Sequence, residues 1–390
     1  MQRHHASRIG KWLATDTAGE KVRAYLPKPL PPDPPLDLNR LLLLIGRAEQ
    51  ALGRLDGMTA ILPSTSLFIF MYVRKEALLS SQIEGTQSSL SDLLLFENNE
   101  TPFVPLDDVQ EVSNYVSAME HGLKRLAEGF PLSLRLIREM HRELLSKGRG
   151  SSKQPGEFRT TQNWIGGTRP GNALFVPPPS SHLMECLGDL ERFLHDRTKY
   201  PILIRAALAH VQFETIHPFL DGNGRLGRLL ITLMLCEEKA LTEPILYLSL
   251  FFKAHRSRYY ELLQTVRERG DWEAWLEFFL EGVIETSNQG VATAQRLLKL
   301  FERDRAKIAG LSRAAPSALR MHAELQRSPL LSVPIAAKKL GTSRPTVRKS
   351  LEHLQELDIV REITGKQRGR VYEYHQYLRI LDEGTEPLKP

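Results

Sequence analysis

The sequence predicts a mainly α-helical protein with a short β-hairpin-like flap and a basic C-terminal region. Apolar residues recur at three- and four-residue spacing along most of residues 38–288, which is typical of amphipathic helices. Strand signals in that stretch are confined to residues 156–179, where glycines and prolines break any helix and the runs WIGG and ALFV are β-prone. Residues 333–370 have the pattern of helix, glycine turn, helix and hairpin.

Length and composition indicate several domains. The chain has 390 residues, of which 42% are hydrophobic and 25% charged, so it can bury a large core. We expect an N-terminal helical segment (1–105), a helical core (106–290), a linker helix (291–315) and a basic C-terminal domain (316–390). The six prolines of residues 26–36 favour an extended strap, because proline lacks an amide donor.

Several protein classes are excluded by what the sequence lacks. The start MQRHHASRIGKW has no apolar signal-peptide core, and no run approaches the roughly 18 apolar residues of a membrane span. Cys186 and Cys236 are too few and too far apart for a disulfide framework or a cysteine zinc site. We therefore expect a cytoplasmic protein with no membrane partner. Its net charge of +6 is concentrated in residues 316–380, which hold twelve Lys and Arg against six Asp and Glu.

The stretch HPFLDGNGRLGR, from His217 to Arg228, places turn-forming and charged residues directly ahead of the apolar run LLITLML. Pro218 disfavours helical geometry at His217, and Gly222 and Gly224 permit positive backbone angles. We expect a tight glycine loop that leads straight into a helix N-terminus. The unpaired amides and the helix dipole at such a terminus form an anion site.

Charged side chains around this loop are of the types that bind and activate phosphorylated substrates. Arg225 and Arg228 are three residues apart, so both lie on one face of the first helical turn and can fork onto phosphate oxygens. Asp221 supplies a hard oxygen ligand of the kind that Mg²⁺ takes beside substrate phosphates. His217 carries an imidazole, which can accept a proton as a general base.

Two other interpretations compete for this stretch. Residues 222–227, GNGRLG, match the dinucleotide fingerprint G-x-G-x-x-G, but that motif follows a buried strand. The preceding IRAALAHVQFETIHPF is alanine-rich and helix-like, so a Rossmann site is rejected on context. The second alternative is a plain glycine turn with solvated arginines, which the combination of all these residues in twelve positions argues against.

HPFLDGNGRLGR resembles the signature of the Fic/DOC family, H-x-F-x-[DE]-G-N-G-R-x-x-R, and matches it at every defined position. In that family a helical core positions the loop to transfer AMP from ATP to a hydroxyl side chain of a target protein. The resemblance implies a Fic-type protein adenylyltransferase. It also implies ATP and Mg²⁺ as nucleotide and metal, and a target protein or the chain itself as acceptor.

The resemblance assigns a role to each residue of the loop. His217 would deprotonate the target hydroxyl for in-line attack on the α-phosphorus, and Phe219 would anchor the loop. Asp221 would hold Mg²⁺ between the α- and β-phosphates, with pyrophosphate as the leaving group. The nucleotide would be bound from the glycine turn through the first helical turn, by Gly222, Asn223, Gly224, Arg225, Leu226, Gly227 and Arg228.

Two more segments are similar to parts of Fic proteins. GEFRTTQNWIGG resembles the flap that pairs with the target's backbone as an added strand. The candidate flap residues are Ile165, Gly166, Gly167 and Thr168. In HRSRYYELLQ, Tyr259 and Tyr260 stand where relatives carry aromatic residues near the adenine, although core packing explains them equally well. An asparagine that contacts nucleotide in some relatives aligns near Arg267, which leaves the base-side contacts open.

A short N-terminal motif resembles the Fic inhibitory helix, [ST]-x-x-x-E-[GN]. Its residues here are Ser80, Glu84 and Gly85. The resemblance implies that Glu84 pairs with Arg228, occupies the arginine that the γ-phosphate needs and so inhibits the enzyme. A solvent-facing helix glutamate is the alternative. His141, His210 and Glu214 are interpreted as structural helix residues.

Residues 333–363 and the following ITGKQRGRVYEY resemble a winged helix-turn-helix. Gly341 ends the first helix, Thr342 or Ser343 caps the second, and Arg344, Arg348 and Lys349 make the second helix basic. The expected hairpin has basic residues at its tip: Lys366, Arg368 and Arg370. Such a domain binds DNA or docks a protein.

Two functions therefore remain after the sequence analysis. The first is an autoinhibited protein adenylyltransferase, which uses every residue of the loop. The alternative is a DNA-binding regulator whose Fic core has a secondary or altered activity, with another nucleotide donor or removal of AMP. The sequence leaves the target and the oligomeric state open, a homodimer among the options.

Overall fold

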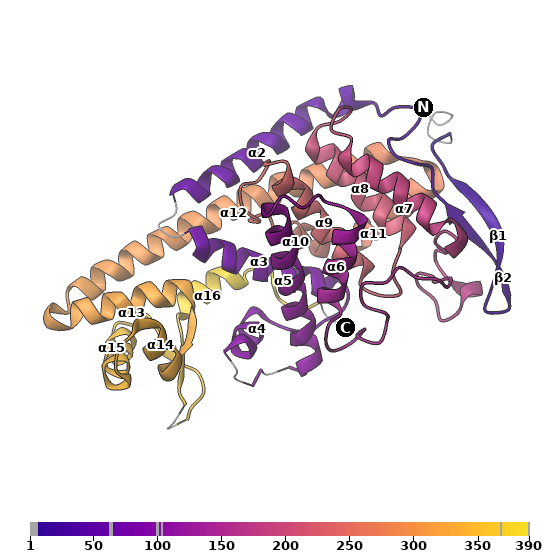
Figure 1. Cartoon of the computed structure of the whole chain (residues 1–390). Coiled ribbons are helices and arrows are strands. Elements are labelled where there is room, and N and C mark those ends of the chain that lie inside the picture. The colour runs from indigo at the N-terminus through magenta and orange to yellow at the C-terminus, as the bar shows by residue number, and fades with distance from the viewer. Residues whose placement is uncertain (1–6, 62–64, 99–100, 103, 367–368, 389–390) are drawn as a thin grey trace.

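The computed structural model describes residues 7–61, 65–98, 101–102, 104–366 and 369–388, and the chain is mainly α-helical, as predicted (Figure 1). Within these ranges no helix combines the length and apolarity needed to cross a membrane, and Cys186 and Cys236 are free. The helices up to the glycine loop are α2 (Leu42–Ile61), α3 (Thr65–Ile83), α4 (Leu90–Glu97), α5 (Leu106–Ala127), α6 (Leu134–Leu144), α7 (Ser180–His195) and α8 (Ile202–Ile216). After the loop follow α9 (Asn223–Glu237), α10 (Ser249–Ala254), α11 (Arg256–Arg269) and α12 (Trp272–Ala309).

The chain begins with a β-hairpin that the sequence analysis did not predict. Strands β1 (Lys11–Thr17) and β2 (Glu20–Leu26) pair antiparallel around a two-residue turn at Ala18 and Gly19, both with positive φ. Such turns match the twist of the flanking strands. Tyr25 of β2 packs against Phe175, with ring centroids 5.9 Å apart. The helical description of residues 1–105 is therefore wrong for residues 11–26, and the hairpin braces the predicted flap segment.

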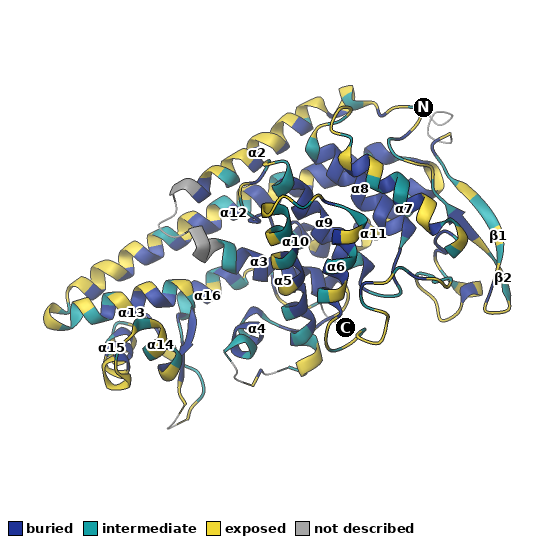
Figure 2. Cartoon of the chain, viewed as in Figure 1, coloured by how far each residue is buried: buried dark blue, intermediate teal, exposed yellow. Residues whose placement is uncertain are grey.

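Helices α8 and α9 form the centre of the core and carry the glycine loop between them. Every residue of α8 from Leu203 to Ile216 is buried, which explains why its sequence is apolar nearly all round. Helices α3, α5, α6, α7, α11 and α12 each pack against one or both of the two, and Figure 2 shows this central region as the most continuously buried part of the fold. A loop between two fully packed helices is held on a rigid scaffold, as a precise site requires.

Helix α12 is a single helix of 38 residues that joins the core to the C-terminal region. At 1.5 Å per residue it is roughly 57 Å long. It begins at Trp272, where the Asp271 side chain accepts a hydrogen bond from the Ala274 amide. It packs along α2 (Figure 1). The predicted linker helix at 291–315 is therefore not a separate element, because its first nineteen positions continue the last helix of the core.

The C-terminal region contains the helix, glycine turn and helix that the sequence predicts. Helix α14 (Val333–Leu340) ends at Gly341, which has a positive φ, and α15 (Arg344–Glu356) is capped by the Ser343 hydroxyl. The residues at the predicted hairpin tip, Lys366 and Arg370, are exposed, and Arg368 lies outside the described residues. The other elements are α13 (Ala315–Arg327), α16 (His375–Asp382) and a sheet in the order β3 (Leu330–Ser332), β5 (Val371–Glu373), β4 (Arg361–Glu362).

Candidate functional site

The glycine loop has the backbone geometry that its sequence predicts. Helix α8 ends where His217 takes a left-handed conformation, with φ of 50°, directly before Pro218. Helix α9 begins after Gly222, whose φ is 77°. The first amides of α9 have no partner within the helix, so they form a donor cluster at the positive end of its dipole. The helix head that the sequence predicts as an anion site is therefore present.

Asn223 holds the loop in shape through its side chain. Its Oδ1 accepts a hydrogen bond from the Phe219 amide at 2.9 Å, and its Nδ2 donates to the Phe219 carbonyl at 2.8 Å. Phe219 is fully buried, as its predicted anchoring role requires. Asn223 lines the hollow, and because its side chain is bonded to Phe219, its backbone amide is the group that it offers at the helix head.

Three residues that support the loop were not assigned to the site from the sequence. His141 stacks on the Phe219 ring, with centroids 3.7 Å apart, and its Nε2 lies 3.0 Å from the Asp221 carbonyl. Arg159 Nε donates to the His217 carbonyl at 3.0 Å, and Asn163 Nδ2 donates to the same carbonyl at 3.2 Å. The sequence signal was their place in LIREMHREL and GEFRTTQN, next to predicted structural features. The interpretation of His141 as an ordinary helix residue is incomplete, because it supports the loop.

His217 presents a neutral imidazole next to the helix head. Burial, with the charges of Arg267 and Arg159, lowers the pKa of His217 to about 3. Its Nδ1 is buried and has no hydrogen-bond partner among the described residues. The imidazole is therefore uncharged at neutral pH, which is the protonation state that a general base needs.

A hollow of about 210 Å³ opens in front of the helix head. This volume is below the roughly 300–1,000 Å³ typical of small-molecule sites. Glu84 lines the hollow, whereas Arg228 does not. The residues that line it are Glu84, Glu111, Arg149, His217, Leu220, Asp221, Gly222, Asn223, Gly224 and Arg225.

Glu84 lies directly on the anion-binding surface. Arg228 donates from Nη2 to Glu84 Oε1 at 2.7 Å, and from Nε to the Ser80 hydroxyl at 2.8 Å. A Cβ added at Gly224 would collide with the Glu84 carboxylate, so that carboxylate sits against the first turn of α9. Desolvation acts to raise the pKa of Glu84, but the positive charges nearby, Arg228 foremost, outweigh it and lower that pKa. The carboxylate is therefore ionised and paired. Gly85 follows in the turn after α3, with φ of 105°.

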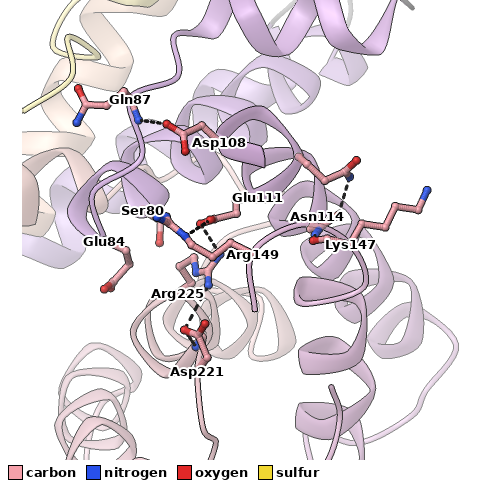
Figure 3. Close-up of polar contacts among 12 residues, drawn as sticks. Ser80, Glu84, Gln87, Asp108, Glu111, Asn114, Lys147, Arg149, Asp221 and Arg225 are labelled. Carbon is pink, nitrogen blue, oxygen red and sulfur yellow. Dashed lines mark hydrogen bonds and ion pairs between the residues drawn. The ribbon is translucent and has the colours of Figure 1, made fainter. Parts of the chain in front are cut away.

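Arg225 belongs to a second charged cluster, which Figure 3 shows in close-up. Its Nη1 donates to Glu111 Oε2 at 3.1 Å, and Arg149 Nε lies 2.6 Å from Glu111 Oε1. Glu111 comes from α5 and is buried, and Arg149 comes from the loop after α6. Neither residue is predicted from the sequence, because nothing in local spacing connects them to a loop more than 65 positions away.

Asp221 is the residue with the chemistry to hold a divalent cation. Its carboxylate is 39% exposed and faces the hollow beside Arg225, whose Nη2 lies 3.8 Å away. No group of three potential metal-ligating side chains occurs in the part of the chain that the structure describes. One carboxylate fits Mg²⁺, which usually takes one or two protein ligands and completes its shell with phosphates and water.

Other predicted site residues lie outside the hollow. Leu226 is buried, and the Gly227 carbonyl lies 2.9 Å from His210 Nδ1 within the core. Tyr259 is also fully buried and bonds His210 through its hydroxyl at 2.8 Å, so it is a core residue. Tyr260 is 40% exposed and carries Arg256 over its ring. The side chains of Leu226 and Tyr259 and the carbonyl of Gly227 therefore lie in the core and do not line the hollow.

The predicted flap is an exposed loop with a single bridge between strands. Ile165 pairs with Phe175, and its amide donates to the Phe175 carbonyl at 2.8 Å. Gly166 and Gly167 both have positive φ, and the Thr168 amide donates to the Asn172 side chain. Gly166, Gly167 and Thr168 are exposed, and none of the four lines the hollow.

Arg267 is a structural residue in this chain. Its Nη2 donates to the Glu214 carbonyl at 3.1 Å, and its guanidinium stacks over Phe175 at 4.0 Å. It is buried and ties the C-terminal end of α8 to the flap. Cations are favourable at that end of a helix because of its dipole.

Comparison with known proteins identifies the family of this loop and of the helices around it. Residues 131–235 match the sequence model of the Fic/DOC family, and residues 42–124 match that of the Fic/DOC family N-terminal region. Two relatives named protein adenylyltransferase Fic, from Drosophila melanogaster and Drosophila sechellia, are each 32% identical over 179 residues. The match covers 45% of this chain and 33% of each relative, so it spans about a third of their length.

Solved structures share the fold. A Fic family protein from Desulfovibrio desulfuricans G20 aligns with a TM-score of 0.58 at 20% identity, over 86% of this chain and 95% of its own. A Fic domain containing signaling protein from Bacteroides thetaiotaomicron aligns with a TM-score of 0.53 at 19% identity, over 64% of this chain and 97% of its own. These likenesses confirm the helical Fic architecture that the sequence predicts.

Proposed function

We propose that this chain, which carries a Fic domain behind the family's N-terminal region, transfers AMP from ATP to a hydroxyl side chain of a protein. The observation that carries the proposal is the hollow itself. Helix-head amides, Arg225, the Asp221 carboxylate and a neutral His217 all face one space. Phosphoryl chemistry needs positioning and charge stabilisation, and these groups supply both.

The proposed reaction assigns one task to each group. His217 takes the proton of the target hydroxyl, whose oxygen then forms a bond to the α-phosphorus. The bond from the α-phosphorus to the bridging oxygen breaks, and pyrophosphate leaves. The helix-head amides and Arg225 hold the phosphate oxygens, and Asp221 holds Mg²⁺, which supplies positive charge at the phosphates when bound.

The inhibited state follows from the position of Glu84. Its carboxylate lies where the phosphates would meet the first turn of α9, and it pairs with Arg228. A nucleotide therefore has to displace Glu84 before Arg228 can bind phosphate. Ser80 also accepts from Arg228, so part of the arginine's hydrogen bonding remains satisfied when Glu84 moves away.

The flap supports recognition of an extended target segment. Gly166 and Gly167 leave their backbone groups exposed, and Asn163 at the base of the flap bonds the loop carbonyls of His217 and Phe219. A target strand paired to the flap would thus be coupled to the position of the catalytic loop.

A second candidate function rests on the C-terminal region, whose element order fits a winged helix-turn-helix. On α15, Arg344, Arg348 and Lys349 are exposed, whereas Val347 and Leu351 face the core. A helix with one buried apolar stripe and one basic face suits the DNA phosphate backbone. This candidate is a DNA-binding regulator in which the Fic core is secondary.

Mass measurement of the intact protein separates the two functions. After incubation with Mg-ATP, we expect Glu84→Gly to gain the mass of one AMP or to transfer labelled AMP to a protein in cell extract. The wild type should gain less, because Glu84 occupies the anion site. Binding of duplex DNA that weakens with salt, without any transfer by Glu84→Gly, would favour the regulator instead.

A further inference from the structure

The first inference deepens the proposed function and concerns Arg149, which lines the hollow together with Arg225. Glu111 is only 2% exposed, yet its one negative charge faces two guanidinium groups, those of Arg225 and Arg149. Asp221 also borders this cluster, with its carboxylate 3.8 Å from Arg225 Nη2, so two guanidinium groups and two carboxylates meet at the edge of the hollow. Arg149 is 57% exposed at its side chain, so its remaining N–H groups can reach a ligand.

The loop that carries Arg149 is built to hold it at this place. Gly148 and Gly150 flank it, with φ of 75° and 86°, conformations that other residues rarely adopt. Asn114 Nδ2 on α5 donates to the Lys147 carbonyl at 2.8 Å (Figure 3). A Cβ at Gly150 would lie 2.7 Å from Asp221 Oδ2, so the loop backbone is in close contact with the proposed metal ligand.

From this geometry we propose that Arg149 binds the nucleotide's phosphates and that Glu111 is the positioning residue for Arg149 and Arg225. The ion pair of Arg149 with Glu111 is formed at Nε, which leaves the outer N–H groups of the guanidinium for phosphate oxygens. The proposal rests on the function proposed above. It adds a phosphate ligand from outside the glycine loop.

The test compares Arg149→Met with Lys147→Met, a cation removed from the same loop. In the Glu84→Gly background, we expect Arg149→Met to raise the KM for ATP at least about tenfold, with a smaller change in kcat, and to weaken Mg-ATP binding by calorimetry equally. Lys147→Met should change neither.

Two further variants test the positioning role of Glu111. Glu111→Gln should weaken Mg-ATP binding, as Arg149→Met does. Arg149→Lys should keep part of the Mg-ATP affinity that Arg149→Met loses. If Arg149→Met binds Mg-ATP like Lys147→Met, the assignment is wrong. Calorimetry needs no transfer, so it decides the point even if the proposed reaction is not observed.

The second inference concerns the segment after α16, which lies against α3 and α10. Three buried side chains donate to its backbone carbonyls. Lys75 Nζ bonds the Glu383 carbonyl at 2.9 Å, and Gln82 Nε2 bonds the Thr385 carbonyl at 2.7 Å. Lys253 Nζ bonds the Gly384 carbonyl at 3.1 Å and also the Glu386 carbonyl.

These contacts tie the tail tightly to the fold. Lys75, Gln82, Lys253 and Thr385 are each at most 6% exposed. Desolvation lowers the pKa of both lysines to about 8, because burial disfavours a charged ammonium group. The tail carbonyls that accept hydrogen bonds from these groups offset part of that cost. Without the tail, two buried cations and one buried amide would lose acceptors, which is costly in a protein interior.

Gln82 connects the tail to the inhibitory residues. It lies between Ser80 and Glu84, and its Nε2 also donates to the Ser88 carbonyl at 2.9 Å. One amide group thus joins the tail to the turn that follows Glu84. The orientation of that turn decides whether Glu84 reaches Arg228.

We infer that residues 383–386 form a latch that holds Glu84 on Arg228. The latch follows directly from α16 of the C-terminal region, so a ligand bound there has a short covalent path to the inhibitory turn. Release of the latch frees the turn and relieves the inhibition.

Truncations of the full chain test the latch. Ending the chain after Asp382 should raise AMP transfer towards the level of Glu84→Gly, and ending it after Glu386 should not. In the Glu84→Gly background neither truncation should add anything, because the latch acts only through Glu84. Lys253→Met, which removes a tail contact made from α10 and leaves the sequence of α3 unchanged, should raise transfer in the same direction.

Amide hydrogen exchange gives an independent readout for the same variants. Residues 80–88 should exchange faster after the truncation at Asp382 and in Lys253→Met, and at the wild-type rate after the truncation at Glu386. Unchanged exchange in the first two variants would rule the latch out. A complete lack of transfer by Glu84→Gly would instead refute the proposed function and leave the exchange result to judge the latch.

Discussion

Glu84→Gly is expected to raise AMP transfer about ten- to a hundredfold. The change removes a charge-assisted hydrogen bond to Arg228, an interaction worth about 1.5–3 kcal/mol, and about 1.4 kcal/mol corresponds to a factor of ten. It also clears the carboxylate from the first turn of α9, which enlarges the space for phosphates. The rate of labelling from ATP carrying label in its α-phosphate measures the effect.

Two further variants show whether the charge of Glu84 is responsible. Glu84→Gln keeps the length of the side chain without its charge and should give an intermediate rate. Gln87→Gly places a glycine at an exposed position of the same turn, so it controls for backbone freedom and should behave like the wild type. Because the pKa of Glu84 is lowered, mild acidification to pH 6 should leave it ionised and the inhibition intact. Activation by Gln87→Gly equal to that by Glu84→Gly would show that Glu84 has no specific inhibitory role.

His217→Ala is expected to lower transfer in the Glu84→Gly background by about a hundredfold or more. A positioned general base contributes about 10²- to 10⁴-fold, and no other imidazole lines the hollow among the described residues. Binding of Mg-ATP should be retained, because His217 acts on the target hydroxyl. His255→Ala, at an exposed position on another element, is the matched control.

The pH dependence of kcat/KM provides a second check on His217. The pKa of His217 is lowered to about 3. The neutral, proton-accepting form is therefore fully present above pH 5 and is lost only as the pH falls through the pKa. We therefore expect no loss of activity between pH 8 and pH 5 that is due to this imidazole. A decline centred near pH 6.5, absent from a control reaction, would show that the pKa of the His217 imidazole is not lowered by its surroundings.

Prediction from sequence worked best where neighbouring residues set the backbone. Pro218 and Gly222 predict the turn into α9, and that turn is present with positive φ at both His217 and Gly222. The approach of Glu84 to Arg228 came from a resemblance, since 144 positions separate the two residues. Sequence spacing left core packing and ligand contact equally open for Tyr259 and did not show that Leu226 lies in the core, because burial is set by residues distant in the sequence.

Elements were missed for a related reason. The hairpin at residues 11–26 has short strands with charged and polar residues, so the sequence pattern that would predict it is weak. Its position is fixed by the packing of Tyr25 on Phe175, which the sequence does not show. Likewise, the sequence around residue 290 does not show whether the last helix of the core ends there or continues. Helix α12 runs through that position because its apolar face packs along α2.

The amino-acid sequence alone determined the helical class, the helix head with its glycine loop, and the chemical types of the side chains beside it. These depend on local backbone preferences and on periodic burial, which a few adjacent residues encode. Tertiary structure alone decided the sharing of Glu111 between Arg149 and Arg225 and the seating of the C-terminal tail on Gln82. Both join distant segments, and a charge finds its partner only after the apolar faces of whole helices have packed and fixed the distance between them.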